Sequence, residues 1–168
     1  MWRSERSRHF GAGGILLNNI AWALRHLPAF AVFGHGAYRL QPIHVEDYAA
    51  VAVREATATG TRTIDAVGPE SFSFRRLVDV VRSGLGLATP IIRLPPRLGW
   101  HACRLLSWWQ DDALLTRDEI TGLMRGLLHT GAAPQGERRV CDTVRAEAAT
   151  LGLAYANECA RRVVVSRC

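Results

Sequence analysis

The sequence predicts an α/β fold that is rich in helices and has only a few short strands. Two observations lead to this fold class: apolar residues recur at helical spacing in several segments, and short apolar runs bounded by turn residues alternate with those segments. Apolar residues make up 48% of the 168-residue chain and charged residues 21%, which is ordinary for a globular protein. A chain of this length is long enough for one domain with a buried core.

The first predicted elements are a helix over residues 14–27 and a strand over 29–34. The first segment carries apolar residues spaced for one helical face, and Pro28 disfavours helix at the residue before it. The run AFAVFG then predicts a strand, and the GHG sequence at 34–36 predicts the turn that follows it.

A second strand and helix are predicted over residues 41–45 and 46–57. Glu46 or Asp47 falls in the first turn of this helix, where a carboxylate complements the helix dipole. One face of the helix is expected to consist of Tyr48, Ala49, Ala52 and Ala56.

The middle of the chain predicts a strand over 62–67, a turn at the GPES sequence, and a helix that begins after Ser73 and ends at Gly84. Serine is a typical N-cap residue, and glycine is typical of a helix end. The residues expected on the buried side of this helix are Phe74, Leu77, Val78 and Val81. The run IIRL predicts a further strand over 91–94.

The remaining predicted elements are helices over about 95–109 and 116–127, a loop over 131–140 and a helix over 141–151. Two prolines suit the start of the first of these helices, and Thr116 with Glu119 forms a capping-box pattern. Because the predicted strands are few and short, the sheet that they form is expected to be incomplete.

The chain has a formal net charge of +6 and a pI of about 9.9, which raises the question of an anionic partner. All 21 basic residues are arginine, and they are scattered rather than interleaved with aromatic residues as in a nucleic-acid groove. No nucleic-acid partner is therefore expected. The absence of lysine from the sequence excludes every mechanism that needs a lysine ammonium or a Schiff base.

The four cysteines are far apart and form no Cys-x-x-Cys pair or other set with the spacing of a zinc site. No metal site is therefore predicted, and reduced thiols in a cytoplasmic protein are expected. The apolar runs fall well short of the ~20 residues needed to cross a bilayer, so no transmembrane segment is expected.

Two spaced motifs give the chain a resemblance to a known family. The run from Phe10 to Ala56 contains QPIHVEDYA at 41–49, and the run from Asp65 to Val81 begins DAVGPES. Together they resemble the C-terminal part of extended or atypical short-chain dehydrogenase/reductase (SDR) proteins, the NAD-dependent epimerase/dehydratase group. The branch that they resemble most is the one similar to the complex I accessory subunit.

The resemblance implies NAD(P) as the family's cofactor, held by a Gly-rich turn in an N-terminal Rossmann half. The GAGG sequence at 11–14 is a poor match to that turn, because Leu16 stands where the third glycine would fall and no apolar strand precedes it. The family's catalytic Tyr-x₃-Lys pair is also absent from a chain without lysine. Hence no catalytic and no cofactor-binding residue is predicted, and the isolated chain is expected to bind no cofactor.

These features predict an incomplete C-terminal portion of a Rossmann-like SDR fold. Residues 1–9 are expected to be a disordered or aberrant tail, residues 10–130 the substrate-side region, and residues 131–168 a C-terminal loop and helix extension. The expected partner is a missing Rossmann half or a second copy of the chain. The alternative is a non-catalytic module, derived from an SDR protein, that binds a partner or serves as a scaffold.

Four residues are candidates for the rim of a substrate cleft at the carboxyl end of the sheet: Arg39, Gln41, His44 and Asp47. A structural interpretation stands beside this one. In it, His44 packs at the end of a strand, and Asp47 supports the N-terminus of the following helix.

Overall fold

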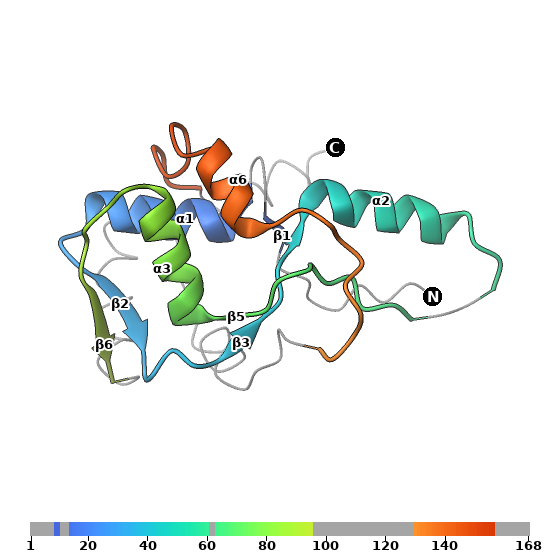
Figure 1. Cartoon of the computed structure of the whole chain (residues 1–168), viewed down its shortest axis with the longest axis horizontal. Coiled ribbons are helices and arrows are strands. Elements are labelled where there is room, and N and C mark those ends of the chain that lie inside the picture. The colour runs from blue at the N-terminus through green and yellow to red at the C-terminus, as the bar shows by residue number, and fades with distance from the viewer. Residues whose placement is uncertain (1–8, 11–13, 61–62, 96–129, 157–168) are drawn as a thin grey trace, which may run out of the picture.

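The computed structural model describes residues 9–10, 14–60, 63–95 and 130–156. Its first elements are strand β1 (His9–Phe10), helix α1 (Ile15–His26) and strand β2 (Phe30–Phe33) (Figure 1). The predicted helix over 14–27 and strand over 29–34 are thus confirmed to within a residue at each end. His9, which was expected to belong to the N-terminal tail, lies in β1.

The QPIHVEDYA segment contains two short strands and the start of a helix. Strands β3 (Arg39–Leu40) and β4 (Ile43–His44) lie on either side of Gln41 and Pro42, and helix α2 (Val45–Ala56) follows directly. The strand expected over 41–45 is therefore shorter than predicted, whereas the helix expected over 46–57 is confirmed.

The buried side of α2 differs from the predicted one. Val51 is buried and packs with Ile43 and Ala66, whereas Ala49 and Ala56 are exposed. The prediction was wrong for these two alanines because α2 buries only a narrow face, which packs against Ile43 and Ala66.

The second half of the fold contains β5 (Phe72–Ser73), helix α3 (Phe74–Gly84), β6 (Ile91–Leu94) and helix α6 (Val140–Ala146). Ser73 caps α3 as predicted, since its Oγ accepts a hydrogen bond from the backbone N–H of Arg76 (3.2 Å). All four apolar residues predicted for the inner side of α3 are buried. Helix α6 ends earlier than predicted, and turns follow it. The helices predicted over 95–109 and 116–127 lie outside the described residues.

The strands of the described chain form three separate two-stranded pairs. Strand β1 pairs with β4 and β2 pairs with β6, both in parallel, whereas β3 and β5 are antiparallel. The β2–β6 pair is the longest, with Phe30 opposite Ile91 and Phe33 opposite Leu94. The architecture is therefore mixed α/β, as predicted, with little sheet in the part of the chain that the structure describes.

The strand predicted over 62–67 is wrong for residues 63–67, which have no regular secondary structure. Ala66 and Val67 are buried, as an apolar run should be, but the Val67 carbonyl accepts hydrogen bonds from the N–H groups of Gln135 (2.9 Å) and Gly136 (3.2 Å). A strand needs a ladder of such bonds to a neighbouring strand. Here a loop supplies the partners instead.

The main core lies between α1, α3 and α6, and α3 contacts both of the other helices. Its fully buried residues include Leu24 of α1, Leu77 and Val81 of α3, and Val144 of α6. Figure 1 shows α6 beside α3 and α1, while α2 extends away from them toward the other end of the molecule. None of the described helices is long and apolar enough to cross a membrane.

We expect Gly68→Ala to destabilise the fold. An alanine Cβ at this position would lie 2.0 Å from the carbonyl oxygen of Pro42, so one of the two backbone segments would have to move. Overpacking of this kind typically costs about 1–3 kcal/mol in the free energy of unfolding. Urea denaturation measures this loss.

Gly131→Ala is the matched control, because nothing lies within 4 Å of the added methyl group. It should change the free energy of unfolding by less than about 0.5 kcal/mol. Equal effects of the two substitutions would show that the 42–68 contact is not constrained.

Candidate functional site

The two motif segments of the sequence lie side by side in the structure. Gln41 Nε2 donates a hydrogen bond to the carbonyl oxygen of Gly68 (2.9 Å), and Gly68 in turn approaches the backbone of Pro42 closely. Glycine is suited to such an approach because it has no Cβ. The site is therefore built from the loop between β3 and β4, the start of α2, and the loop at residues 67–70.

His44 is buried and serves as the N-cap of α2. It is 6% exposed, and its backbone is extended, with φ −66° and ψ 141°. Its Nδ1 accepts a hydrogen bond from the N–H of Glu46 (3.2 Å), which is one of the N–H groups that have no partner within the helix. His44 thus packs at the end of strand β4, as the structural interpretation expects, and its place on a cleft rim stays a prediction.

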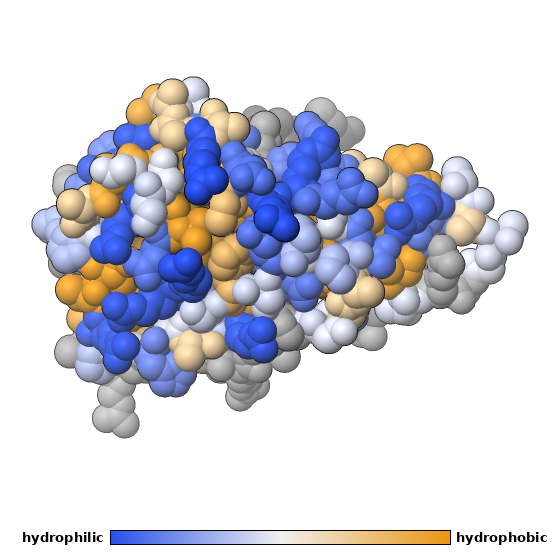
Figure 2. Space-filling model, viewed as in Figure 1, coloured by the Kyte–Doolittle hydropathy of each residue, from blue (hydrophilic) through white to orange (hydrophobic). Residues whose placement is uncertain are grey.

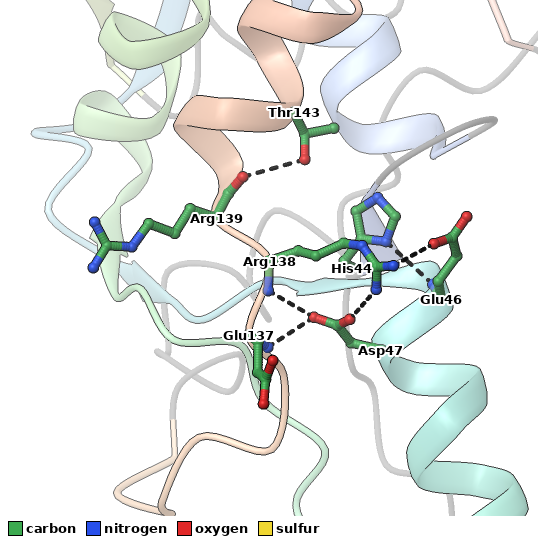
Figure 3. A network of polar contacts seen from close by, with 7 residues as sticks. All are labelled: His44, Glu46, Asp47, Glu137, Arg138, Arg139 and Thr143. Carbon is green, nitrogen blue, oxygen red and sulfur yellow. Dashed lines mark hydrogen bonds and ion pairs between the residues drawn. The ribbon is translucent and has the colours of Figure 1, made fainter.

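Asp47 binds a segment that is distant in the sequence (Figure 3). One carboxylate oxygen accepts hydrogen bonds from the backbone N–H groups of Glu137 and Arg138, both at 2.8 Å. The other oxygen forms a close ion pair with the guanidinium of Arg138. The same guanidinium also contacts the carboxylate of Glu46 at 2.8 Å.

The Asp47 carboxyl group is held in its charged form by these donors. Burial, which on its own would raise its pKa, is outweighed by the N–H groups of Arg138 and Glu137 and by the Arg138 guanidinium, so the pKa lies below its ordinary value. A carboxylate with a low pKa and both oxygens engaged is a poor general base. Its evident role is to hold the loop at 136–138 against the start of α2.

Gly136 allows this loop to come so close. A Cβ at residue 136 would lie 2.9 Å from Asp47 Oδ2 and 3.0 Å from a side-chain carbon of Ile43. A side chain there would separate the loop from the carboxylate that binds it.

Glu70, from the GPES sequence, has a role parallel to that of Asp47. Its Oε2 accepts a hydrogen bond from the N–H of Val140 (2.7 Å), the first residue of α6, whose own N-cap residue Arg139 provides no side-chain cap. A carboxylate at this position also complements the helix dipole. Two carboxylates, one from each sequence motif, therefore bind backbone N–H groups of the 137–140 segment.

The Cys141 thiol in α6 and the Tyr38 phenol before β3 both have a raised pKa. Burial raises the pKa of the Cys141 thiol, and the charge of Glu70, whose Oε1 lies 3.9 Å from Sγ, adds to the rise. Burial also raises the pKa of Tyr38, which stacks on Phe74 with 5.2 Å between ring centroids. Nucleophilic thiols and acid/base phenols need a lowered pKa instead.

The four predicted cleft residues lie at three places in the structure. His44 and Asp47 are buried and join the contacts of Figure 3, whereas Arg39 is exposed on β3 and donates to Ser71 Oγ at 3.3 Å. Gln41 lies between β3 and β4, and its side chain donates a hydrogen bond to the carbonyl oxygen of Gly68. The substrate cleft itself stays a prediction.

Sequence reasoning missed Arg138, which lies in the predicted 131–140 loop. Its neighbours in the sequence, Glu137 and Arg139, form with it an unremarkable charged run, and no local pattern distinguishes the middle residue. The part of the chain that the structure describes contains no group of three or more His, Cys, Asp or Glu residues that could hold a metal ion.

Comparison with models of known protein families finds none that matches this chain, and a search of curated proteins likewise finds no match. The SDR resemblance therefore stays a prediction based on the two motifs.

We expect Asp47→Asn to destabilise the protein by about 1–3 kcal/mol, because hydrogen bonds to a charged group are replaced by weaker ones and Arg138 loses one of its two carboxylate partners. Urea denaturation at pH 7 measures the change. Asp142→Asn is the control: it removes a carboxylate from an exposed pair with Arg145 (3.8 Å) and should cost no more than about 0.5 kcal/mol. Equal losses would contradict the role assigned to Asp47.

The contribution of Asp47 should depend on pH in a definite direction. Because the folded-state pKa is lowered from 3.8, this contribution is fully present above about pH 5 and is lost as the pH falls through the folded pKa. The difference in unfolding free energy between the wild type and Asp47→Asn should therefore be constant from pH 7 to about pH 5 and shrink below pH 3.8. A difference that grows on acidification would contradict the lowered pKa.

Proposed function

We propose that this chain is the substrate-side segment of an SDR-like, NAD(P)-binding α/β protein and that it is not catalytic by itself. The observation that carries the proposal is the contact between Gln41 and Gly68, which brings the two family-like motifs together at the ends of short strands. In open α/β sheets, ligands bind in the crevice beyond the carboxyl ends of the strands. Arg39 and Gln41 are the residues that this proposal places nearest to a substrate.

The strand pairs give further support. Parallel strands normally lie in sheets with both faces covered. In the β2–β6 pair, Ile91 packs against the main core, while the next residue, Ile92, is 42% exposed. Figure 2 shows apolar surface at the end of the molecule where Figure 1 places this pair. The proposal assigns this face to contact with the nucleotide-binding half of the protein.

A second function, a partner-binding or scaffold module without redox chemistry, is favoured by one observation. Asp47 and Glu70, one carboxylate from each motif, are engaged in holding the 137–140 segment, so these motif residues already have a structural use. Under this alternative, the β2–β6 face binds a protein partner and no nucleotide is involved.

The purified chain should bind NAD(H) and NADP(H) no better than millimolar, because the Gly-rich turn and its ribose-binding acid are absent. Isothermal titration calorimetry measures this directly. It should also bind the dye ANS through the apolar face at Ile92, and Ile92→Ser should lower the dye fluorescence.

The matched control is Val53→Ser on α2, an exposed apolar residue remote from the β2–β6 pair, which should leave the dye fluorescence unchanged. Micromolar affinity for NAD(H) would contradict the proposal. A chain that binds no dye and melts in a single sharp transition would also contradict it, because such a chain exposes no apolar face for a nucleotide-binding half to cover.

A further inference from the structure

Residues 135–156, called the strap from here on, are held by side chains from the first half of the chain that bind the strap's backbone. Asp47 and Glu70 accept from its N–H groups near α6. Arg25 donates to the carbonyl oxygens of Ala148 (2.7 Å) and Leu151 (3.0 Å).

Two asparagines of α1 hold the end of the strap. Asn18 binds Gly152 N–H and the Ala154 carbonyl, and Asn19 binds both backbone groups of Ala156.

The underside of the strap is apolar and fits a surface formed by α1 and α3. Val140, Val144 and Leu151 are buried in the main core. Val144 comes so close to α3 that a Cβ on Gly84 would lie 2.6 Å from its Cγ1. Gly152, with φ +76°, lies equally close to α1, since a Cβ there would lie 2.5 Å from Ala21 C. A short helix lying in an apolar groove between other helices is a recurring mode of peptide recognition.

The strap depends on this surface for its order. Helix α6 has seven residues, too few to be stable in isolation, and residues 130–139 before it have no regular secondary structure. The charged and asparagine side chains that bind it all belong to residues 18–70. A second copy of the chain presents the same side chains and the same apolar surface, which is the condition for exchange of an element between copies.

We infer that the strap is a detachable element and that the surface beneath it, formed by α1, α3, Asp47 and Glu70, also accepts the strap of a second copy. The occupant is defined by the contacts of this structure: apolar residues at the positions of Val140 and Val144, and an arginine that pairs with Asp47. This inference goes beyond the proposed function, because it depends on neither NAD(P) nor a substrate.

Hydrogen exchange of the wild-type chain tests whether the strap opens separately. Backbone N–H groups of residues 137, 138 and 140 should exchange at least roughly tenfold faster than those of Leu77–Val81 in α3, through local opening. Asp47→Asn should accelerate the strap further and leave α3 unchanged. Asp79→Asn, which removes the partner of Arg82 within α3, is the control that should leave the strap unchanged.

A peptide of residues 130–156 tests acceptance from a second molecule. In the full-length Val144→Asp variant, the charge expels the chain's own strap, and the labelled peptide should bind with saturation in fluorescence anisotropy. It should bind the wild type roughly tenfold or more weakly, because the chain's own strap occupies the surface most of the time. The peptide carrying Val144→Asp is the control and should not bind.

Three results would overturn the inference: strap and α3 amides that exchange together, a folded Val144→Asp variant that does not bind the peptide, or a Val144→Asp variant that is unfolded. The last result would mean that the receptor surface does not exist without the strap. None of these measurements involves NAD(H) or the Ile92 face, so their failure is distinct from failure of the proposed function.

Discussion

The carboxylate of Asp47 is the interaction on which the arrangement of this chain depends most. It lies at the start of α2 and reaches a loop some ninety residues further along, where it receives two backbone N–H groups and a guanidinium. Burying a charge is costly unless it is paired and hydrogen-bonded, and both conditions are met here. Two further features hold the same loop in place: Gly136, whose small size admits the loop, and the hydrogen bonds from the N–H groups of Gln135 and Gly136 to the Val67 carbonyl.

Glu70 extends the same principle to α6. A short helix whose cap residue offers no side-chain acceptor needs one from elsewhere, and Glu70 provides it from the loop that Gly68 anchors against Pro42. The two sequence motifs are thus joined directly, as by Gln41 and Gly68, and also through the segment that Asp47 and Glu70 bind. In this chain the motif residues act first as the framework of the fold, and any role at a substrate cleft is limited to the residues that this framework leaves accessible.

Local signals in the sequence were enough to predict most of the helices in the part of the chain that the structure describes. Ser73, the four apolar residues of α3 and Gly84 lie within a dozen residues of one another, so cap, face and end are all determined by neighbours in the chain. The run at 63–67 shows the limit of such reasoning. Its apolar residues are buried as predicted, but whether they form a strand depends on a partner strand, and the backbone groups that face Val67 belong to a loop. The Asp47–Arg138 contact was out of reach for the same reason, because nothing near either residue indicates the other.

The way in which the strap is bound also determines how its sequence is able to vary. Its hydrogen bonds to Asn18, Asn19, Arg25 and Glu70 involve backbone groups, which every residue except proline provides in full. Its outward side chains, among them Glu137, Arg139 and Asp142, are exposed. A few positions are constrained by shape or charge: Gly136 and Gly152, the buried residues Val140, Val144 and Leu151, and Arg138. The strap therefore offers a surface whose charge and chemistry are open to change by substitution, while the attachment underneath stays the same.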